Sequence, residues 1–153
     1  TVPQMKSKLR RNRPDLVVID YLQLMESAKR VENRVQQVSE ITRGLKIMAK
    51  ELNVPVIVCS QLARATEARG KSHVPQLSDL RESGSIEQDA DIVMMLYRPD
   101  YYSNDLEEGQ EADETAAQCI VAKNRHGATG TVDLHWDGRY TKYTAVESDY
   151  DDR

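Results

Sequence analysis

The chain of 153 residues contains few aromatic residues, few cysteines and no long apolar segment. It has no phenylalanine, one tryptophan and two cysteines. No apolar run approaches the roughly 20 residues that a membrane-spanning helix requires, and no signal-peptide pattern is found, so we expect a cytoplasmic protein. Cys59 and Cys119 lie in apolar runs. We therefore expect two buried free thiols rather than a disulfide or a metal site.

Charged residues are abundant, and the acidic ones are clustered. The net charge is −4, but residues 103–114 carry −6 and the last eight residues carry −3, which leaves +5 for the rest. We expect residues 1–145 to form one domain, residues 100–114 to be a disordered acidic insertion, and residues 146–153 to be an acidic tail. A basic body permits a polyanionic partner, although charge alone does not identify one.

The apolar pattern predicts a strand, a helix and a second strand in the first 60 residues. Residues 16–19 form a continuous apolar run, typical of a parallel strand buried on both faces. Apolar residues then recur every three or four positions from Val31 to Leu52, as in a long amphipathic helix, and residues 54–59 form a second apolar run. Such a crossover pairs the strands in parallel. Asp20 and Gln61 are then neighbours at the edge where α/β sheets bind ligands.

The remaining pattern completes an α/β fold class. A helix is expected from Thr1 to Pro14, a short helix near residues 83–88, and strands over residues 92–97, 116–122 and 131–136. The dipeptide Asp137-Gly138 predicts a hairpin with a two-residue turn that leads into residues 140–144. We therefore expect a mostly parallel sheet with flanking helices and a C-terminal β-hairpin.

Two polar residues at the predicted sheet edge could handle a nucleotide. The apolar run that ends at Asp20 has the shape of a Walker B element, whose aspartate holds Mg²⁺ beside the phosphates. Gln61 could hydrogen-bond a γ-phosphate or the attacking water. Each residue also has an ordinary explanation, as a turn cap and as a strand end. The pair favours a nucleotide site more than either member does.

Two further segments carry groups that bind anions. Residues 81–85 combine an arginine with backbone amides beside a glycine, which could cradle a phosphate; a plain helix cap is the alternative. Lys123 and Arg125 stand one residue apart at a strand end. They could reach a neighbouring subunit's nucleotide as an arginine finger, or they could be ordinary solvated charge.

Together these segments resemble the replicative helicases of the bacterial DnaB family. The resemblance rests on residues 18–25, 60–62, 79–91 and 123–127, of which the third stretch is the longest and most specific. It implies a partial RecA-like P-loop NTPase core, with ATP and Mg²⁺ as cofactors. It also implies a homo-hexameric ring that moves along single-stranded DNA and unwinds duplexes 5′ to 3′, with primase and a helicase loader as partners.

The resemblance also implies roles for particular residues. Asp20 corresponds to the Walker B aspartate, which acts on Mg²⁺ through water, and Gln61 to the glutamine that senses the γ-phosphate. Lys123 and Arg125 correspond to the pair that reaches the adjacent subunit's nucleotide. The loop that grips single-stranded DNA corresponds to Arg81, Glu82 and Gly84.

The chain departs from the family's pattern in one respect. No Gly-x-x-x-x-Gly-Lys-Ser/Thr sequence occurs, and only nineteen residues precede Asp20. We therefore interpret the chain as the carboxyl-terminal part of the ATPase domain, and expect it to be unable to hydrolyse ATP alone. A RadA-like recombination ATPase and a non-catalytic module that binds DNA or donates finger residues are the alternatives.

Overall fold

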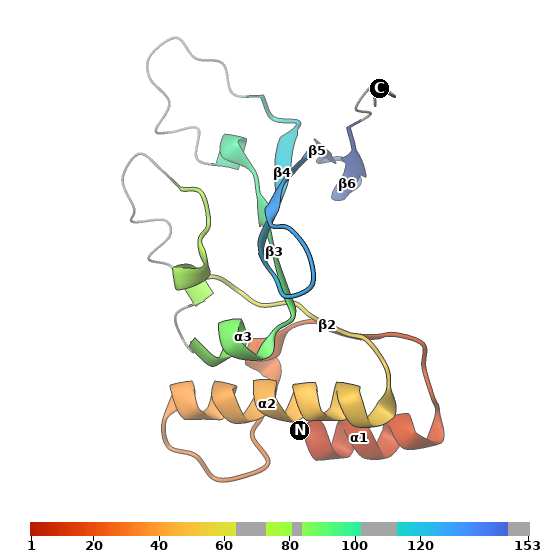
Figure 1. Cartoon of the computed structure of the whole chain (residues 1–153). Helices are drawn as coiled ribbons and strands as arrows, with labels where there is room; N and C mark the ends of the chain where they lie inside the picture. Colours follow the sequence, from red (N-terminus) through yellow and green to blue (C-terminus); the bar gives the residue numbers. More distant parts are fainter. Residues whose placement is uncertain (64–72, 81–83, 102–112, 147–153) are drawn as a thin grey trace. The chain divides into compact units, whose positions relative to one another are not determined.

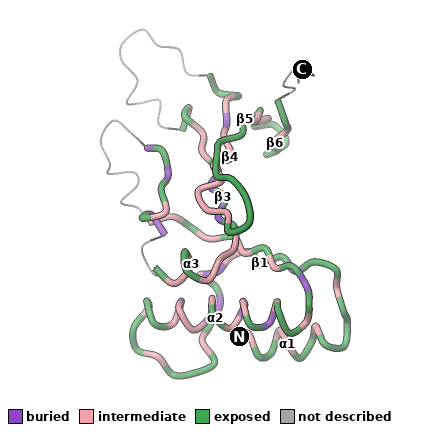
Figure 2. Tube along the Cα trace, viewed as in Figure 1, coloured by how far each residue is buried: buried purple, intermediate pink, exposed green. Residues whose placement is uncertain are grey.

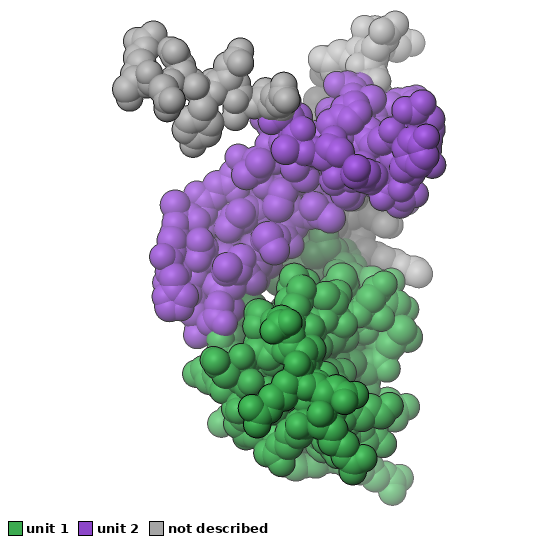
Figure 3. Space-filling model, turned by 90° about the vertical axis from the view of Figure 1, so that its right-hand side faces the viewer, with its two compact units in different colours: residues 1–64, 77–90 green, residues 65–76, 91–153 purple. Residues whose placement is uncertain are grey.

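The computed structural model describes residues 1–63, 73–80, 84–101 and 113–146, which are drawn in colour in Figure 1. The chain divides into two compact units, shown in different colours in Figure 3. Unit 1 comprises residues 1–64 and 77–90, and unit 2 comprises residues 65–76 and 91–153. Among the described helices, none is long and apolar enough to cross a membrane.

Unit 1 has the predicted order of strand, helix and strand, with short helices around it. Its elements are α1 (Val2–Arg11), β1 (Val17–Ile19), the 3₁₀ helix η1 (Leu22–Leu24), α2 (Arg34–Leu52), β2 (Val56–Val58), the 3₁₀ helix η3 (Leu77–Leu80) and α3 (Gly84–Asp89). The side chain of Asn33 caps α2 by accepting a hydrogen bond from Val35 N at 2.8 Å. The helix ends at Asn53, which adopts the left-handed conformation with φ of 50°.

The core of unit 1 lies between α2 and one face of the β1–β2 pair. The buried side chains of α2 recur every three or four residues, as predicted: Val38, Ile41, Leu45 and Met48. They pack with Val17 and Ile19 of β1, and α1 covers the same cluster with partly buried apolar residues. Full burial of one such side chain contributes about 1.5–3 kcal/mol. The amphipathic helix therefore fixes where β1 and β2 lie.

The two strands pair in parallel, as predicted, but only one face of the pair is buried. Val18 lies opposite Ile57, and both are exposed, at 59% and 46%. Figure 2 shows the buried, intermediate and exposed stretches along the chain. The prediction of burial on both faces was wrong because the helices of unit 1 pack against the alternate residues only. For the same reason Cys59 is exposed rather than buried, and Cys119 is half-buried; both thiols are free, as predicted.

Unit 2 is an antiparallel sheet with the strand order β3–β4–β5–β6. Its strands are β3 (Ile92–Tyr97), β4 (Ala116–Asn124), β5 (Gly130–Asp137) and β6 (Lys142–Ala145). The α/β class and the C-terminal hairpin are confirmed, but the expected mostly parallel sheet is limited to β1 and β2. Short connections join β4 to β5 and β5 to β6. Because a parallel pair needs a much longer crossover, these strands pair antiparallel.

The C-terminal hairpin has a longer turn than predicted. Asp137 pairs with Lys142, so four residues, 138–141, form the turn in place of the expected two. Arg139 donates to the Asp137 carboxylate from its backbone N at 3.0 Å and from its guanidinium at 3.0 and 3.2 Å. The hydrogen bond from the Arg139 side chain holds the pKa of the Asp137 carboxyl below its usual value. Thr141 completes the turn with a positive φ of 52°.

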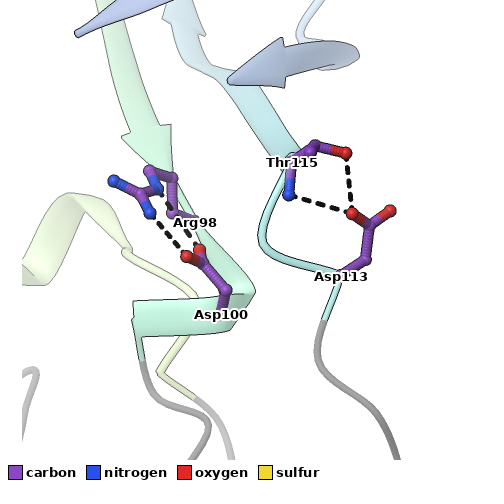
Figure 4. Close-up of polar contacts among 4 residues, drawn as sticks. All are labelled: Arg98, Asp100, Asp113 and Thr115. Carbon is purple, nitrogen blue, oxygen red and sulfur yellow. Dashed lines mark hydrogen bonds and ion pairs between the residues drawn. The ribbon is translucent and has the colours of Figure 1, made fainter. Parts of the chain in front are cut away.

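The two ends of the acidic stretch are anchored locally (Figure 4). Arg98 forms an ion pair with Asp100, and its guanidinium lies 4.4 Å from the centre of the Trp136 ring. Asp113 accepts hydrogen bonds from Thr115 N at 2.9 Å and Thr115 Oγ1 at 2.7 Å. These bonds, the side-chain one foremost, lower the pKa of the Asp113 carboxyl. The predictions of disorder and of an acidic tail fall largely on residues 102–112 and 147–153, which lie outside the described residues.

Candidate functional site

The carboxyl edge of the β1–β2 pair holds the first two predicted site residues. Asp20 follows β1 directly, Gln61 follows β2 by three residues, and both are exposed. The ladder continues past the strands, since Cys59 N donates to Ile19 O at 2.9 Å and Leu22 N donates to Cys59 O at 2.8 Å. The peptide bond between Asp20 and Tyr21 is cis. The structure thus brings Asp20 and Gln61 to one edge, as the pattern predicted.

A third polar residue, Gln23, joins the two strand exits. Its Nε2 donates to Ser60 Oγ at 3.1 Å and to Gln61 O at 3.4 Å, and its Oε1 accepts from Gln61 N at 3.4 Å. Sequence reasoning missed this residue. The available signal was a glutamine between two leucines just after a buried strand, where an apolar residue would be the ordinary choice.

A small hollow lies beside this edge within unit 1. Its lining combines polar and apolar residues that follow β1 and β2 with residues of η3 and α3: Gln23, Ser60, Gln61, Leu62, Ala63, Asp79, Leu80 and Ile86. Asp79 is buried, and its carbonyl oxygen accepts a hydrogen bond from Ala63 N at 3.0 Å. The segment that leaves Gln61 is therefore tied to the segment that enters the predicted DNA-binding loop.

The predicted DNA-binding loop is only partly described. Arg81 and Glu82 lie outside the described residues. Gly84 begins α3 and is exposed, and no neighbouring atom of the described residues lies within 4 Å of the position that a Cβ would take. α3 is fixed to α2 by two side-chain hydrogen bonds: Ser39 Oγ to Ser85 Oγ at 2.9 Å, and Thr42 Oγ1 to Asp89 Oδ2 at 2.6 Å.

Lys123 and Arg125 belong to unit 2, at the end of β4. The register with β3 shifts between Val93 and Met94, because Val93 pairs with Lys123 and Met94 pairs with Val121. Such a β-bulge changes the direction in which the neighbouring side chains point. Arg125 N donates to Asp91 O at 2.9 Å, and the Arg125 guanidinium is exposed, 3.6 Å from the Asp91 carboxylate.

The turn after β4 explains why asparagine and glycine accompany these two cations. Asn124 Nδ2 donates to Ala128 O at 3.2 Å, and its Oδ1 accepts from His126 N at 3.1 Å. A Cβ on Gly127 would lie 2.8 Å from Asn124 Nδ2. The turn therefore needs both residues, and it sets the direction in which the chain leaves Lys123.

The parallel strands with a polar carboxyl edge, followed by an antiparallel sheet, define a RecA-like α/β protein. The family model for the DnaB-like helicase C terminal domain matches residues 1–145, and the chain belongs to this family. It is 50% identical over 147 residues to the replicative DNA helicase DnaB of Leifsonia xyli, covering 94% of this chain and 31% of that protein.

Two solved structures share the fold. A DnaB-like replicative helicase studied with its interactions with primase matches with a TM-score of 0.85 and 44% identity, over 96% of this chain and 36% of that one. A second structure, of an ATPase domain, matches with a TM-score of 0.85 and 45% identity, over 96% of this chain and 52% of that one. The chain spans about a third of the length of the curated relatives it matches.

Proposed function

We propose that this chain is the carboxyl-terminal part of the ATPase domain of a cytoplasmic replicative DNA helicase. The whole protein would form a hexameric ring, hydrolyse ATP with Mg²⁺, move along single-stranded DNA 5′ to 3′, and work with primase and a loader. The family membership supports this function over a RadA-like recombination ATPase. The observation that carries the proposal is the common edge at which Asp20 and Gln61 follow two parallel strands.

Asp20 is suited to hold Mg²⁺ through water. Its carboxylate is exposed and makes no hydrogen bond or ion pair with another described residue. No group of three or more metal-ligating side chains occurs in the described part of the chain. Mg²⁺ keeps several waters and is typically bound by one or two carboxylates together with substrate phosphates, so a single carboxylate at this edge fits. The bound ion would neutralise charge that develops on the phosphates.

Gln61 is suited to report the γ-phosphate. Its side chain is exposed, and among the described residues no partner engages its amide. Two residues further along, Ala63 is bonded to Asp79, which lies two residues before Arg81. A change at Gln61 would therefore reach the DNA-binding loop along a short stretch of backbone.

Arg81, Glu82 and Gly84 are proposed to hold the backbone of single-stranded DNA. The described residues give no steric reason for glycine at position 84, because none of their neighbouring atoms lies within 4 Å of the Cβ position. A close approach of the nucleic-acid backbone would supply such a reason. Arg81 adds a positive charge for the phosphates.

Lys123 and Arg125 are proposed to reach the nucleotide of the adjacent subunit in the ring. The exposed Arg125 guanidinium follows a turn that Asn124 and Gly127 hold in shape. Guanidinium groups delivered by a neighbouring subunit stabilise the charge of the transferred phosphoryl group.

The test of the nucleotide site is Asp20→Asn in the full-length ring. This change removes one carboxylate charge and keeps the shape of the side chain. DNA-stimulated ATPase activity and unwinding should then be lost, with a fall in kcat of roughly 10²-fold or more, because the loss of one transition-state contact typically has an effect of this size. Asp15→Asn is the matched control, because Asp15 is also exposed and precedes the same strand. Full activity in the Asp20→Asn ring would refute the assignment.

We further expect that the 153-residue chain alone does not turn over ATP. It contains no P-loop sequence to cradle the phosphates. The measurement is phosphate release by the purified chain with Mg-ATP and single-stranded DNA. ATP hydrolysis that follows the chain through purification and is lost in the Asp20→Asn variant would contradict this expectation.

A further inference from the structure

We propose that Gln23 is a positioning residue, whose side chain fixes the backbone of Gln61 so that the Gln61 amide can respond to the nucleotide. The inference rests on the sensor role proposed for Gln61. Gln23 is separated from Gln61 by 38 positions in the sequence, yet its side chain bridges the exits of β1 and β2.

The side-chain amide of Gln23 forms hydrogen bonds with both the backbone N–H and the backbone C=O of Gln61. Gln23 Oε1 accepts from Gln61 N, and Gln23 Nε2 donates to Gln61 O, each at 3.4 Å. Nε2 also donates to Ser60 Oγ at 3.1 Å, and that hydroxyl donates to Gln61 O at 3.3 Å. A primary amide supplies two N–H donors and a separate carbonyl acceptor in one planar group. Neither a carboxylate nor an apolar side chain could make all of these contacts.

The backbone that carries Gln23 is itself held on two sides. Leu22, the preceding residue, is 2% exposed, and its N donates to Cys59 O. On the other side Arg34, at the start of α2, donates from Nη2 to Gln23 O at 3.2 Å and from Nη1 to Gln37 Oε1 at 2.8 Å. Gln23 therefore links a fixed part of unit 1 to the segment after β2.

The side chains of the two glutamines make different contacts at this edge. The contacts of the Gln23 side chain go to Ser60 and to the Gln61 backbone, whereas the Gln61 amide is exposed and makes no bond to another described residue. Gln61 can then bind a ligand while its backbone stays in place. Because Ala63 is bonded to Asp79, loosening the Gln61 backbone should also weaken the response to DNA.

The test compares variants of the full-length ring in steady-state ATPase assays with and without single-stranded DNA. Gln23→Met keeps the side-chain length and removes its hydrogen bonds. We expect DNA-stimulated kcat to fall about tenfold while the KM for ATP changes less than about twofold, the signature of an effect on the reacting state rather than on binding. Gln36→Met is the matched control, since Gln36 is exposed on α2 and its side chain makes no hydrogen bond within the described residues.

A double variant separates positioning from a general structural role. Gln61→Ala should reproduce the loss of DNA stimulation, and Gln23→Met combined with Gln61→Ala should be no worse than Gln61→Ala alone, because residues that act as a unit are not additive. Gln23→Glu keeps the acceptor for Gln61 N and loses the donor. It should therefore retain more DNA stimulation than Gln23→Met does.

The outcomes distinguish this inference from the function on which it rests. If Gln61→Ala is impaired but Gln23→Met is fully active, or if their effects multiply, Gln23 does not position Gln61 and the inference is overturned. The same holds if Gln23→Met and Gln23→Glu both lose ATP binding or ring assembly in parallel with activity. If Gln61→Ala is itself fully active, the sensor role proposed for Gln61 fails.

Discussion

Asn124 and Gly127 together determine the shape of the turn after β4. The Asn124 side chain closes the turn with one donated and one accepted hydrogen bond, and Gly127 leaves the room that this side chain occupies. The sequence motif that spans Lys123 to Gly127 drew attention to its two cations. The structure adds that its uncharged members determine the path of the backbone between and after them.

Gly127→Ala should loosen this turn. The added Cβ forces Asn124 to move, and loss of its two hydrogen bonds costs about 0.5–1.5 kcal/mol each. Amide hydrogen exchange of residues 125–129 in the full-length protein should then be at least about 5 times faster. Gly130→Ala is the control, because no neighbouring atom in the described part of the chain lies within 4 Å of its Cβ position. Equal exchange rates in the two variants would contradict the role of Gly127.

The elements that the sequence predicted well are those whose pattern is local. The spacing of apolar residues in α2 and the apolar runs of β1 and β2 were enough to predict the parallel pair and the edge where Asp20 and Gln61 lie. β3 was predicted at its observed bounds for the same reason. Each element depends only on residues that are near one another in the chain, and the parallel pairing of β1 with β2 then follows from the rule for strand–helix–strand crossovers.

The features that the sequence missed depend on residues far apart or on what covers a surface. Gln23 meets Gln61 across 38 positions, and no local pattern announces such a contact. The exposure of Val18 depends on what packs over the second face of its strand. The hairpin turn is a local exception: Asp137 pairs with Lys142, so the turn has four residues, and Arg139 bonds to Asp137 within it.

Arg125→Ala should leave β4 intact and remove ATPase activity from the assembled ring. The backbone bond from Arg125 N to Asp91 O remains, and an exposed ion pair such as the one with Asp91 contributes about 0–1 kcal/mol. Loss of a trans-acting arginine lowers kcat by roughly 10³-fold, while nucleotide binding should be largely kept. Fluorescent-nucleotide titration and ring ATPase measure the two effects.

Arg139→Ala is the matched control for this element. Arg139 is also an exposed arginine of unit 2 paired with an aspartate, Asp137, in the turn between β5 and β6. Its loss should leave ring ATPase unchanged. Normal ATPase in the Arg125→Ala ring would discard the assignment of Arg125 as a finger residue.

At the scale of the molecule, the chain carries an uncovered apolar face. Val18 and Ile57 are register partners on the exposed side of the β1–β2 pair, and parallel strands are ordinarily covered on both sides. The chain corresponds to about a third of its curated relatives. We therefore expect the isolated 153 residues to self-associate through this face.

Val18→Lys should reduce that self-association without unfolding unit 1. Sedimentation velocity should show less concentration-dependent association than for the unchanged chain, and the helical signal in circular dichroism should be kept. Val17→Lys is the contrasting control, since Val17 is 8% exposed and faces the core, where an unpaired charge is very costly. Identical sedimentation of the Val18→Lys and unchanged chains would show that another surface drives association.

The exposed thiol of Cys59 has a practical consequence. It lies two residues before Gln61, outside the packed core, while the other cysteine, Cys119, is half-buried in the other unit. An environment-sensitive fluorophore attached at Cys59 would report directly on events at the ends of β1 and β2. The same alternation that leaves this strand face uncovered thus provides an optical reporter site beside the proposed nucleotide edge, with no need to engineer a new cysteine.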